Sequence, residues 1–584
     1  LQSDPVGFLV QDSQESEQSL NEDQDFNRAS TLSSLVSGAN SVAFDVTSYW
    51  AGKLYDTVLS TRDPQIIYKH LLEVASNYEQ WSEAANILDQ LQGNDQWKND
   101  VVSPDYDYDL LLKRLAQLKK ARKSGDLSQM IFLLRTSLSR NLGDMGQRKL
   151  YAYTHIGTKK LIENYINEVV KQMNIICDRE SEEISIKDKL DFFINTRQSF
   201  GRTALLLSGG ATFGLAHIGV IKCLYECKLL PRIISGTSSG SIIAALLCTK
   251  TDDEIPDTLR AMNSGGFDLE VFEKSSNPDT WYTRFCRFLK QGVLFDVDIL
   301  RECMQRNIPN MTFQEAHNRT RRILNITVSS STAFEMPHLL NYLTAPDVLI
   351  WSAVAASCSV PFVYSSSPLM AKNKAGEIVQ WTPSGHRWID GSVQYDLPMK
   401  KLSELFNVNH FIVCQVNPHV VPFLETKIIP SPISRFVGGL LNLATSELRH
   451  RLSQLSEFGI MPGLMDRIRA IMSQEYYGDI TIVPNTSYAD FLKILSNPTP
   501  ELLQQAILRG ERATWLKISI IKNHCQIELT IDEIISRLRL RLLEATFAEG
   551  TESSSTDSQS EKKNRNLRRK VQPLSTNESA PKDD

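Results

Sequence analysis

The spacing of hydrophobic residues along the chain changes near residue 200. Between about residues 60 and 200 apolar side chains recur every three or four positions, which predicts a series of amphipathic helices. From Thr203 onward the pattern becomes short apolar runs separated by glycine-rich turns and helical segments. Apolar runs that alternate with helices predict a parallel sheet covered on both faces. The chain is therefore predicted to combine a helical domain with an α/β domain, the fold class we expect for its core.

The α/β part contains strand and helix signals in alternation. The predicted strands are residues 203–207, 233–235, 322–328 and 411–416. The predicted helices between them are residues 215–225, 242–247 and 349–360. Residues 264–310 carry two aromatic helices, 281–289 and 297–304, which we expect to form an insertion over the core. Past residue 420 the strand signal fades, and helices are expected at 463–473, 499–515 and 531–547.

A chain of 584 residues is too long for one hydrophobic core and should form several units. We expect a disordered acidic N-terminus, a helical domain, an α/β domain, a helical extension and a disordered tail. The predicted boundaries are 1–31, 32–200, 201–420, 421–547 and 548–584. The tail carries a basic cluster at 562–570, which is either solvated or in contact with anionic lipid or a transport receptor.

Two apolar segments could lie on a lipid surface or pack on a neighbouring domain. They are Leu32–Leu59 and Ile433–Leu455, and the second has apolar residues at helical spacing. The sequence has no uncharged apolar run of 18 residues, so we expect no transmembrane helix, and it shows no signal peptide. Any membrane contact should therefore be peripheral.

Charge and cysteine content narrow the class of protein. The net charge is −5, which gives no general attraction to nucleic acid. The nine cysteines form no Cys-x-x-Cys pair, and several lie in apolar runs, as expected for reduced thiols in an intracellular protein. In the helical region we expect the charged residues on outer faces and no chemistry.

The clearest chemical motif is Gly236-Thr237-Ser238-Ser239-Gly240. Two β-branched residues precede it and a run of small apolar residues follows, so it reads as strand, sharp turn and helix. Such an elbow places Ser238 at a helix N-terminus, where free N–H groups favour developing negative charge. We therefore predict Ser238 as a nucleophile.

The turn after the first strand, Ser208 to Gly214, is the second candidate. Its small residues Gly209, Gly210 and Ala211 could direct backbone N–H groups at one point and form an oxyanion hole. A dinucleotide-binding loop is the alternative, but the turn matches that pattern only loosely, and the serine elbow would then have no role.

The base is not identified by pattern alone. Seven downstream histidines are available by number: 317, 338, 386, 410, 419, 450 and 524. None lies in a turn that singles it out, whereas Asp390 follows a short apolar run and precedes Gly391, so it could be presented at a strand end or serve as an ordinary turn residue. His217 is expected to be a packing residue with a polar tip.

These motifs resemble the patatin-like phospholipases in order and spacing, over about residues 60 to 545. Further segments resemble the fungal and plant triacylglycerol lipases of lipid droplets within that family: residues 325–328, 337–346, 351–354 and 356–361, and in the helical region residues 134–136, 140–143 and 157–159. The resemblance implies a patatin-like sheet and a Ser–Asp dyad without histidine.

By this resemblance Ser238 is the nucleophile and Asp390 the proton acceptor. The backbone of Gly209, Gly210 and Ala211 forms the oxyanion hole, and the motif glycines are Gly214, Gly236, Gly240 and Gly391. Two residues depart from the broad family pattern. Phe213 stands where many members have Arg or Lys, which favours an uncharged ester, and Ser392 replaces a Gly or Ala.

The function implied by the resemblance is hydrolysis of triacylglycerol to diacylglycerol and fatty acid at the lipid-droplet surface, with possible endoplasmic reticulum association. A phospholipase, a lysophospholipid acyltransferase, or a weakly active droplet-bound scaffold are the alternatives. No His-x-x-x-x-Asp acyltransferase motif occurs at any of the ten histidines. We expect no cofactor, no metal and no nucleic acid partner; the expected partners are triacylglycerol, phospholipid and a membrane surface.

Overall fold

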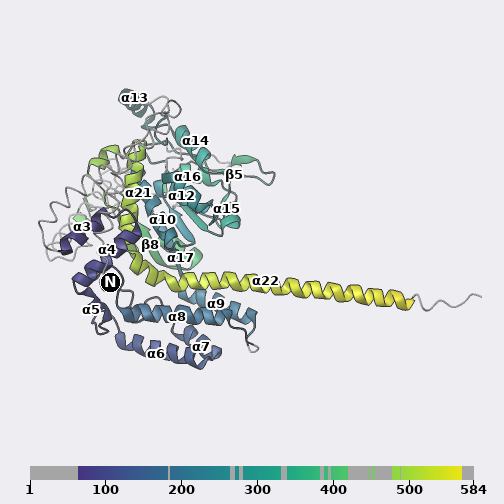
Figure 1. Ribbon diagram of the computed structural model, residues 1–584. Helices are drawn as coiled ribbons and strands as arrows, with labels where there is room; N and C mark the ends of the chain where they lie inside the picture. The colour runs from purple at the N-terminus through teal and green to yellow at the C-terminus, as the bar shows by residue number, and fades with distance from the viewer. Residues whose placement is uncertain are drawn as a thin grey trace, which may run out of the picture. The chain divides into compact units, whose positions relative to one another are not determined.

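The computed structural model describes most of the chain from residue 64 to residue 568 (Figure 1). The described residues are 64–181, 184–263, 270–274, 280–330, 338–381, 387–391, 396–417, 476–486 and 488–568, with 443, 446, 447, 450, 451 and 454. The chain divides after His70, and residues 71–584 form one compact part. Of the first part only residues 64–70, the start of α3 (Pro64–Val74), are described.

Several predicted segments lie outside the described residues. They are the acidic N-terminus 1–31, the segment 32–59, most of the 433–455 stripe, the helix 463–473 and the tail beyond residue 568; within the stripe Leu443 is described and is 68% exposed. The roles and structures predicted for these segments stay predictions.

The helical region follows the predicted period closely. Its helices are α4 (Tyr78–Leu91), α5 (Asn94–Asn99), α6 (Tyr108–Ser124), α7 (Leu127–Ser137), α8 (Lys160–Asp178) and α9 (Ile186–Phe200). Side-chain oxygens cap the N-termini of four of them: Asn77 accepts from the Gln80 N–H, Asp107 from the Leu110 N–H and Asp126 from the Gln129 N–H, and Ser185 forms a capping box. Such caps satisfy N–H groups that a helix start leaves without partners.

The prediction that charged residues of this region lie on outer faces was wrong for several of them. Asp89 is fully buried and pairs with Lys98 at 2.9 Å. Lys159 is 1% exposed; its Nζ donates to the carbonyls of Trp97 and Asp100, and it lies over the Trp97 ring. Buried charges persist where they are paired and hydrogen-bonded. A helical period shows which face is apolar but not which polar side chains are covered by a neighbouring loop.

The α/β part is built on a seven-stranded sheet with the main order β4-β3-β2-β1-β8-β9, and β7 also pairs with β3. The strands are β1 (Arg202–Leu207), β2 (Ile233–Gly236), β3 (Ile323–Ser330), β4 (His338–Leu340), β7 (Trp388–Asp390), β8 (Val408–Cys414) and β9 (Ile480–Ile482). The pairs from β3 through β9 along this order are parallel, and β4 and β7 run antiparallel to β3. A separate two-stranded sheet joins β5 (Met370–Lys372) to β6 (Ile378–Gln380). The predicted parallel-rich α/β fold is confirmed.

Both faces of the sheet are buried, as continuous apolar strands require. Leu205 and Leu207 of β1 point into the larger hydrophobic core, whereas Ala204 and Leu206 point into a smaller core on the opposite face. The larger core contains residues of α10 (Ala216–Glu226), α11 (Ser239–Cys248) and α16 (Ile350–Ser357). The smaller core contains residues of α17 (Met399–Phe406).

The C-terminal end of the chain is helical in most of its described portion, as predicted, and it packs on the rest of the fold. β9 adds a parallel strand to the sheet beside β8, although the strand signal fades there in the sequence. α21 (Pro500–Trp515) packs on α10 of the α/β part. α22 (Ile518–Arg568) packs on α8 and α9 of the helical region, and Figure 1 shows these three helices side by side.

Helix α22 extends beyond its predicted range at both ends. It begins at Ile518, before the expected start at residue 531, and it continues to Arg568, past residue 547 where a disordered tail was expected. The sequence from Thr551 to Arg568 contains no glycine or proline, so nothing in it stops a helix that the packed residues before it have already nucleated.

A buried polar network joins α22 to the sheet. Glu528 is 5% exposed and accepts the Thr203 N–H at 2.7 Å, and the Arg140 guanidinium pairs with it at 3.0 Å. Arg140 also donates to the carbonyl of His524 at 2.6 Å. Because these residues come from three separate segments, the network fixes the helical region, the first strand and the C-terminal helix together.

Two other predictions concern composition. All nine cysteines are free thiols, and seven of them are buried, which confirms that the chain has no disulfide framework. Among the described residues, no helix is both long enough and apolar enough to span a bilayer.

The contact between α10 and α21 generates a first prediction, because the two helices touch backbone to backbone. A Cβ at Gly510 would lie 2.0 Å from the Ala216 carbonyl oxygen. We expect Gly510→Ala to lower the free energy of unfolding by about 1–3 kcal/mol through overpacking, despite the gain of about 1 kcal/mol in helix propensity. Urea unfolding of the whole chain measures this change.

The matched control is Gln505→Ala on the exposed side of the same helix. It should leave stability unchanged or raise it slightly. A Gly510→Ala protein as stable as the parent would show that α10 and α21 do not pack as closely as described.

Candidate active site

Ser238 lies at the turn between β2 and α11. Its backbone angles are φ 53° and ψ −127°, a conformation that residues other than glycine rarely adopt. The residue is 7% exposed, and it precedes the first turn of α11, whose N–H groups point toward the turn. The predicted strand–turn–helix geometry around Ser238 is therefore present.

The glycines on either side of Ser238 are required by close backbone contacts. A Cβ at Gly236 would lie 2.4 Å from the Gly240 carbonyl oxygen, and a Cβ at Gly240 would lie 2.3 Å from that of Leu207. A Cβ at Gly214 would lie 2.4 Å from Ser239 Oγ. The elbow thus packs directly on the end of β1 and on the loop that follows it.

The loop after β1 approaches the elbow but uses one of its predicted donors elsewhere. The Gly209 N–H donates to Asp396 Oδ1 at 3.0 Å, so it is directed at a carboxylate. Ala211 has φ 49° and lines the same cavity as Ser238. A Cβ at Gly210 would lie 2.9 Å from the Val416 carbonyl oxygen. Gly210 and Ala211 therefore remain the predicted oxyanion donors, and the hydrogen bond to Asp396 gives Gly209 a positioning role.

Asp390 is fully buried at the end of β7, where its backbone lies opposite Val328 of β3. Its N–H donates to the Ser359 carbonyl at 3.0 Å, just after α16. A Cβ at Gly391 would lie 2.5 Å from the Thr327 carbonyl oxygen, so this glycine lets the chain pass close to β3. The short apolar run before Asp390 is a strand, as predicted.

Ser357, near the end of α16, links the surroundings of Asp390 to those of Ser238. Its Oγ accepts the Ser238 N–H at 3.0 Å and donates to the Thr327 carbonyl at 2.8 Å. Burial raises the pKa of the neighbouring Cys358 thiol far above its ordinary value, and the Asp390 carboxylate raises it further. Cys358 lines the same cavity as Ser238, so both predicted catalytic residues lie beside the end of α16.

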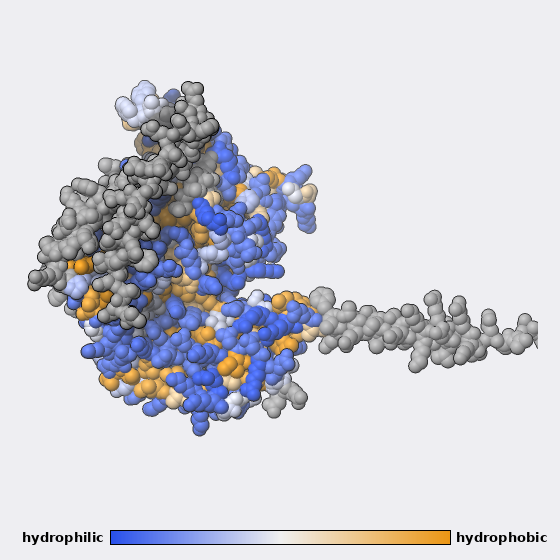
Figure 2. Space-filling model, viewed as in Figure 1, coloured by the Kyte–Doolittle hydropathy of each residue, from blue (hydrophilic) through white to orange (hydrophobic). Residues whose placement is uncertain are grey.

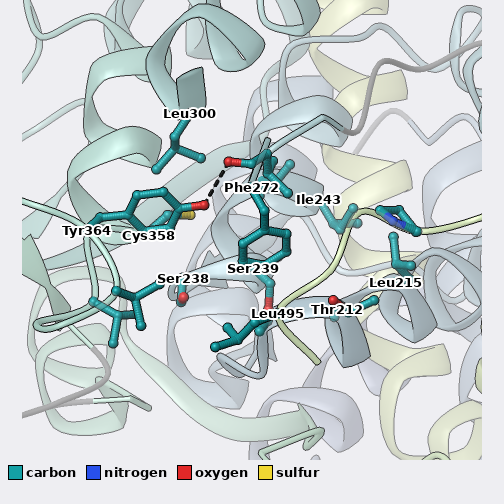
Figure 3. A pocket seen from close by; sticks show the side chains of 17 residues that line it. Thr212, Leu215, Ser238, Ser239, Ile243, Phe272, Leu300, Cys358, Tyr364 and Leu495 are labelled. Atoms are coloured by element: carbon teal, nitrogen blue, oxygen red, sulfur yellow. Dashed lines mark hydrogen bonds between the residues drawn. The ribbon is translucent and has the colours of Figure 1, made fainter. Parts of the chain in front are cut away.

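The cavity beside Ser238 has a volume of about 200 Å³ and an almost entirely apolar wall (Figure 3). Figure 3 shows Ser238, Ser239 and Leu300 around this space, and its dashed line marks the bond from the Tyr364 hydroxyl to the Val271 carbonyl, 2.7 Å long. The apolar lining includes Leu215, Ile242, Ile243, Val271, Phe272, Leu300, Val360, Val363, Leu495 and Pro498. Such a cavity suits a hydrocarbon chain attached to a group that reacts at Ser238.

Asp396 is a positioning residue that the sequence analysis missed. Its carboxylate accepts from the Gly209 N–H and, at 2.6 Å, from Asn417 Nδ2, and its carbonyl accepts the Thr237 hydroxyl at 2.8 Å. Burial raises the pKa of Asp396 to about 7, and the nearby Asp390 charge adds to this effect. Asp396 therefore holds the loop after β1, the elbow and the end of β8 in register. Its only sequence signal is an Asp-Leu-Pro that precedes a helix.

Four of the described histidines bond groups other than Ser238. His217 is fully buried, with Nε2 2.9 Å from the Ser208 carbonyl and Nδ1 3.0 Å from Cys414 Sγ. Because a carbonyl only accepts, Nε2 carries the hydrogen, and burial lowers the pKa of His217 to about 4. The expected packing role of His217 is confirmed. His317 bonds the Arg322 carbonyl, and His410 bonds His524.

Within the described residues, no group of three or more His, Cys, Asp or Glu side chains could hold a metal ion.

Comparison with known proteins places these features in one family. Residues 205–402 match the patatin-like phospholipase model, and residues 58–198 match a domain of unknown function, DUF3336. The chain is 40% identical over 470 residues to triacylglycerol lipase ptl3 of Schizosaccharomyces pombe, covering 80% of this chain and 96% of that protein. This chain belongs to the patatin-like phospholipase family.

Two further relatives carry the same kind of name. Triacylglycerol lipase 4 of Saccharomyces cerevisiae is 41% identical and triacylglycerol lipase SDP1L of Arabidopsis thaliana is 40% identical, over 80% and 81% of this chain. The chain spans 53% and 58% of these two relatives' lengths. The predicted resemblance to patatin-like triacylglycerol lipases is thus confirmed.

Solved structures are more distant. VipD from Legionella pneumophila aligns at 15% identity with a TM-score of 0.26, covering 56% of this chain and 67% of that one. At this level the likeness adds nothing to the patatin-like fold described above.

The two departures from the family pattern have different outcomes. Phe213 is 8% exposed and meets Phe491 edge to face, with ring centroids 5.2 Å apart, so it serves the hydrophobic core. Ser392 lies outside the described residues.

The link through Ser357 generates a second prediction. In Ser357→Ala the buried Ser238 N–H loses its partner, so the free energy of unfolding should fall by about 1–3 kcal/mol. A displaced elbow should also lower kcat for a soluble p-nitrophenyl ester by between about tenfold and a hundredfold. Urea unfolding and steady-state kinetics measure the two effects.

Ser352 on the same helix provides the matched control. It is fully buried, and its Oγ donates to Leu349 and accepts the Met370 N–H at 3.0 Å, away from the elbow. Ser352→Ala should cost similar stability but leave kcat near that of the parent. Equal kcat losses in both variants would mean that Ser357 acts only through general stability.

The buried carboxyl of Asp396 generates a third prediction. Folding raises its pKa from 3.8 to about 7, so the folded state holds the proton more tightly than the unfolded chain. Its contribution to stability is therefore full below about pH 4 and is lost as the pH rises through about 7. The free energy of unfolding of the parent, relative to Asp396→Asn, should fall by up to about 4 kcal/mol across this range.

Urea unfolding of both proteins between about pH 4 and about pH 8 provides the measurement. Asp257→Asn, which replaces a carboxylate side chain that is 77% exposed, serves as the control for the loss of a surface carboxylate. A pH-independent difference between the parent and Asp396→Asn would show that Asp396 does not titrate in this range.

Proposed function

We propose that this chain is a triacylglycerol lipase in which Ser238 and Asp390 form the catalytic dyad. The observation that carries the proposal is the strained elbow at Ser238, which opens onto an apolar cavity of about 200 Å³. The names of the relatives supply the substrate class, triacylglycerol.

In the first half of the reaction, Ser238 Oγ attacks the ester carbonyl carbon while its proton passes to the Asp390 carboxylate. The tetrahedral intermediate carries a negative oxygen, for which the N–H groups of Gly210 and Ala211 are the proposed donors. The C–O bond to the glycerol part then breaks, and Asp390 returns the proton to the leaving oxygen. Diacylglycerol departs, and the acyl group stays on Ser238 as an ester.

In the second half, water attacks the acyl carbon and gives its proton to Asp390. The tetrahedral intermediate collapses, Ser238 recovers the proton, and the fatty acid leaves. One carboxylate thus acts first as a base and then as an acid in each half, as general acid–base catalysis requires. The burial of Asp390 supports this role because electrostatic interactions with the reacting groups are stronger in a site that excludes water.

The wall of the cavity favours an uncharged ester. The lining residues that the structure describes carry no formal charge, and their polar side-chain atoms are the hydroxyls of Thr212, Ser238, Ser239 and Tyr364 and the Cys358 thiol. Phe213 at the predicted cation position of the loop adds no charge either. These features support a neutral lipid as substrate in preference to a phospholipid, whose headgroup would need charged partners.

We also propose the lipid-droplet surface as the place of action, with the cytosolic face of the endoplasmic reticulum as a second membrane. The inferred substrate is insoluble in water and collects in droplets, so the enzyme must meet it at a surface. The lack of a spanning helix among the described residues fits peripheral attachment.

The proposal predicts the effect of removing either dyad member. Ser238→Ala and Asp390→Asn should each lower the hydrolysis of emulsified triolein by at least about a thousandfold, because the two groups act as one unit. Thermal unfolding should show that both variants stay folded. Lipid-class profiling of the products, with the parent beside Ser238→Ala, identifies which esters are cleaved.

His338→Ala and His524→Ala are the comparison variants. A loss in one of them that matched Ser238→Ala, together with a mild Asp390→Asn, would replace the dyad with a histidine triad. Faster release of fatty acid from phospholipid than from triolein would overturn the proposed substrate.

A further inference from the structure

Helix α13 (Trp281–Gln291) presents its apolar face to solvent. Trp281 is 78% exposed, Tyr282 63%, Phe285 51% and Leu289 67%, and the helix has no buried residue. In a surface helix of a globular protein, the apolar stripe faces the core and the charged residues face outward. The arrangement in α13 is the reverse.

The charged side of α13 is the side that holds it to the protein. Arg284 pairs with Glu273 at 2.6 Å and lies over the Phe295 ring, 5.1 Å from its centroid. Arg287 donates to the Leu294 carbonyl at 3.0 Å. These contacts fix which face points outward, so the exposure of the aromatic residues does not come from a free rotation of the helix.

The contacts of α13 lead directly to the cavity at Ser238. Glu273 follows Phe272, a lining residue, and Phe295 packs against both Phe272 and Tyr364 of the cavity wall, with centroids 5.2 and 5.9 Å apart. The Leu294 N–H donates to Phe362, which is 53% exposed, beside the lining residue Val363. Helix α13 is therefore joined to the cavity wall through Glu273, which follows a lining residue, and through Phe295, which packs on two of them.

We propose that α13, together with Phe362, is the element that docks this protein onto a phospholipid-coated surface, with its aromatic face inserted among the lipids. The proposal rests on the proposed function only in taking lipid as the occupant. It names a docking site in the described part of the chain, distinct from the two segments that the sequence suggested.

The composition of α13 fits a lipid surface. Tryptophan and tyrosine are favoured at the boundary between headgroups and acyl chains, where one end of the ring is apolar and the other polar. The helix has no acidic residue, and while Arg284 and Arg287 are held to the protein, Lys290 is exposed beside the apolar face. A local positive charge beside an apolar face complements anionic headgroups. In Figure 2 the helix lies at the upper end of the view, where pale side chains face outward.

The test measures the binding of the full chain to vesicles of phosphatidylcholine with phosphatidylserine. The catalytic Ser238→Ala protein is used as the parent, so that binding is measured without hydrolysis. Replacing Trp281, Phe285 and Leu289 together with serine should weaken binding by at least about tenfold, which corresponds to about 1.4 kcal/mol. The matched control is Phe132→Ser, a 62% exposed aromatic residue of α7, which should leave binding unchanged.

Two further measurements separate docking from folding and from catalysis. With Ser238 restored, the triple variant should hydrolyse a soluble p-nitrophenyl ester at the parent rate but lose activity on emulsified triolein. Brominated lipid should quench part of the tryptophan fluorescence of the parent, and Trp281→Phe, which keeps an aromatic ring, should bind normally and lose that quenched part.

Unchanged vesicle binding in the triple variant would overturn the proposal. So would a parent that binds no vesicle but forms a dimer that the triple variant cannot form, since a second copy would then cover the helix. A parent that binds vesicles through α13 yet hydrolyses no ester would leave the docking site standing and refute only the proposed function.

Discussion

The active site depends on one tight backbone contact, that of the serine elbow against the end of β1. Gly240 approaches the Leu207 carbonyl so closely that no side chain fits between them, and the Thr237 N–H donates to the same carbonyl at 3.2 Å. With both sides of the turn held to β1, Ser238 is left in a strained conformation that raises its hydroxyl above the sheet. The sheet stores this strain because its parallel strands are buried on both faces and cannot shift independently.

Polar groups inside an apolar core complete the arrangement. Ser357 joins the elbow to β3, and Asp396 joins the elbow to the loop after β1 and to the end of β8. A hydrogen bond in such surroundings is stronger than one in water, and a missing partner costs more. These two residues therefore determine where the Ser238 hydroxyl and the proposed oxyanion donors lie, although neither is proposed to react.

Segments far apart in the chain stabilise the same sheet. β9 extends it, and α21 covers one of its helices through glycine contacts. Helix α22 joins the sheet to the helical region through Glu528, which bonds Thr203 and Arg140, and through its buried isoleucines. The helical region is thus continuous in packing with the segment that follows the α/β part. Helix α13 differs from these helices, because its aromatic face is exposed to solvent beside the cavity instead of being packed on the protein.

The sequence by itself determined the elements whose signal is local. Runs of a few residues are enough to predict several features. These are the strands β1, β2 and β3, the glycines of the elbow, the Asp390–Gly391 turn and the free cysteines. Close contacts that exclude a Cβ leave glycine as the only choice, and that choice is visible in the sequence. The family resemblance came from the same short motifs.

Tertiary structure alone decided the features that depend on distant partners. No local sequence pattern predicts four of these features. They are the strand β9, the buried ion pair of Asp89 and Lys98, the hydrogen bond from the Gly209 N–H to Asp396, and the outward aromatic face of α13. Only the Asp-Leu-Pro that precedes a helix distinguishes Asp396 in the sequence from a surface carboxylate. Its importance arises because three loops from different parts of the chain meet around it, and burial among them changes its pKa. The spacing of hydrophobic residues predicts which face of a helix or strand is apolar, but only the folded chain determines which residues that face contacts.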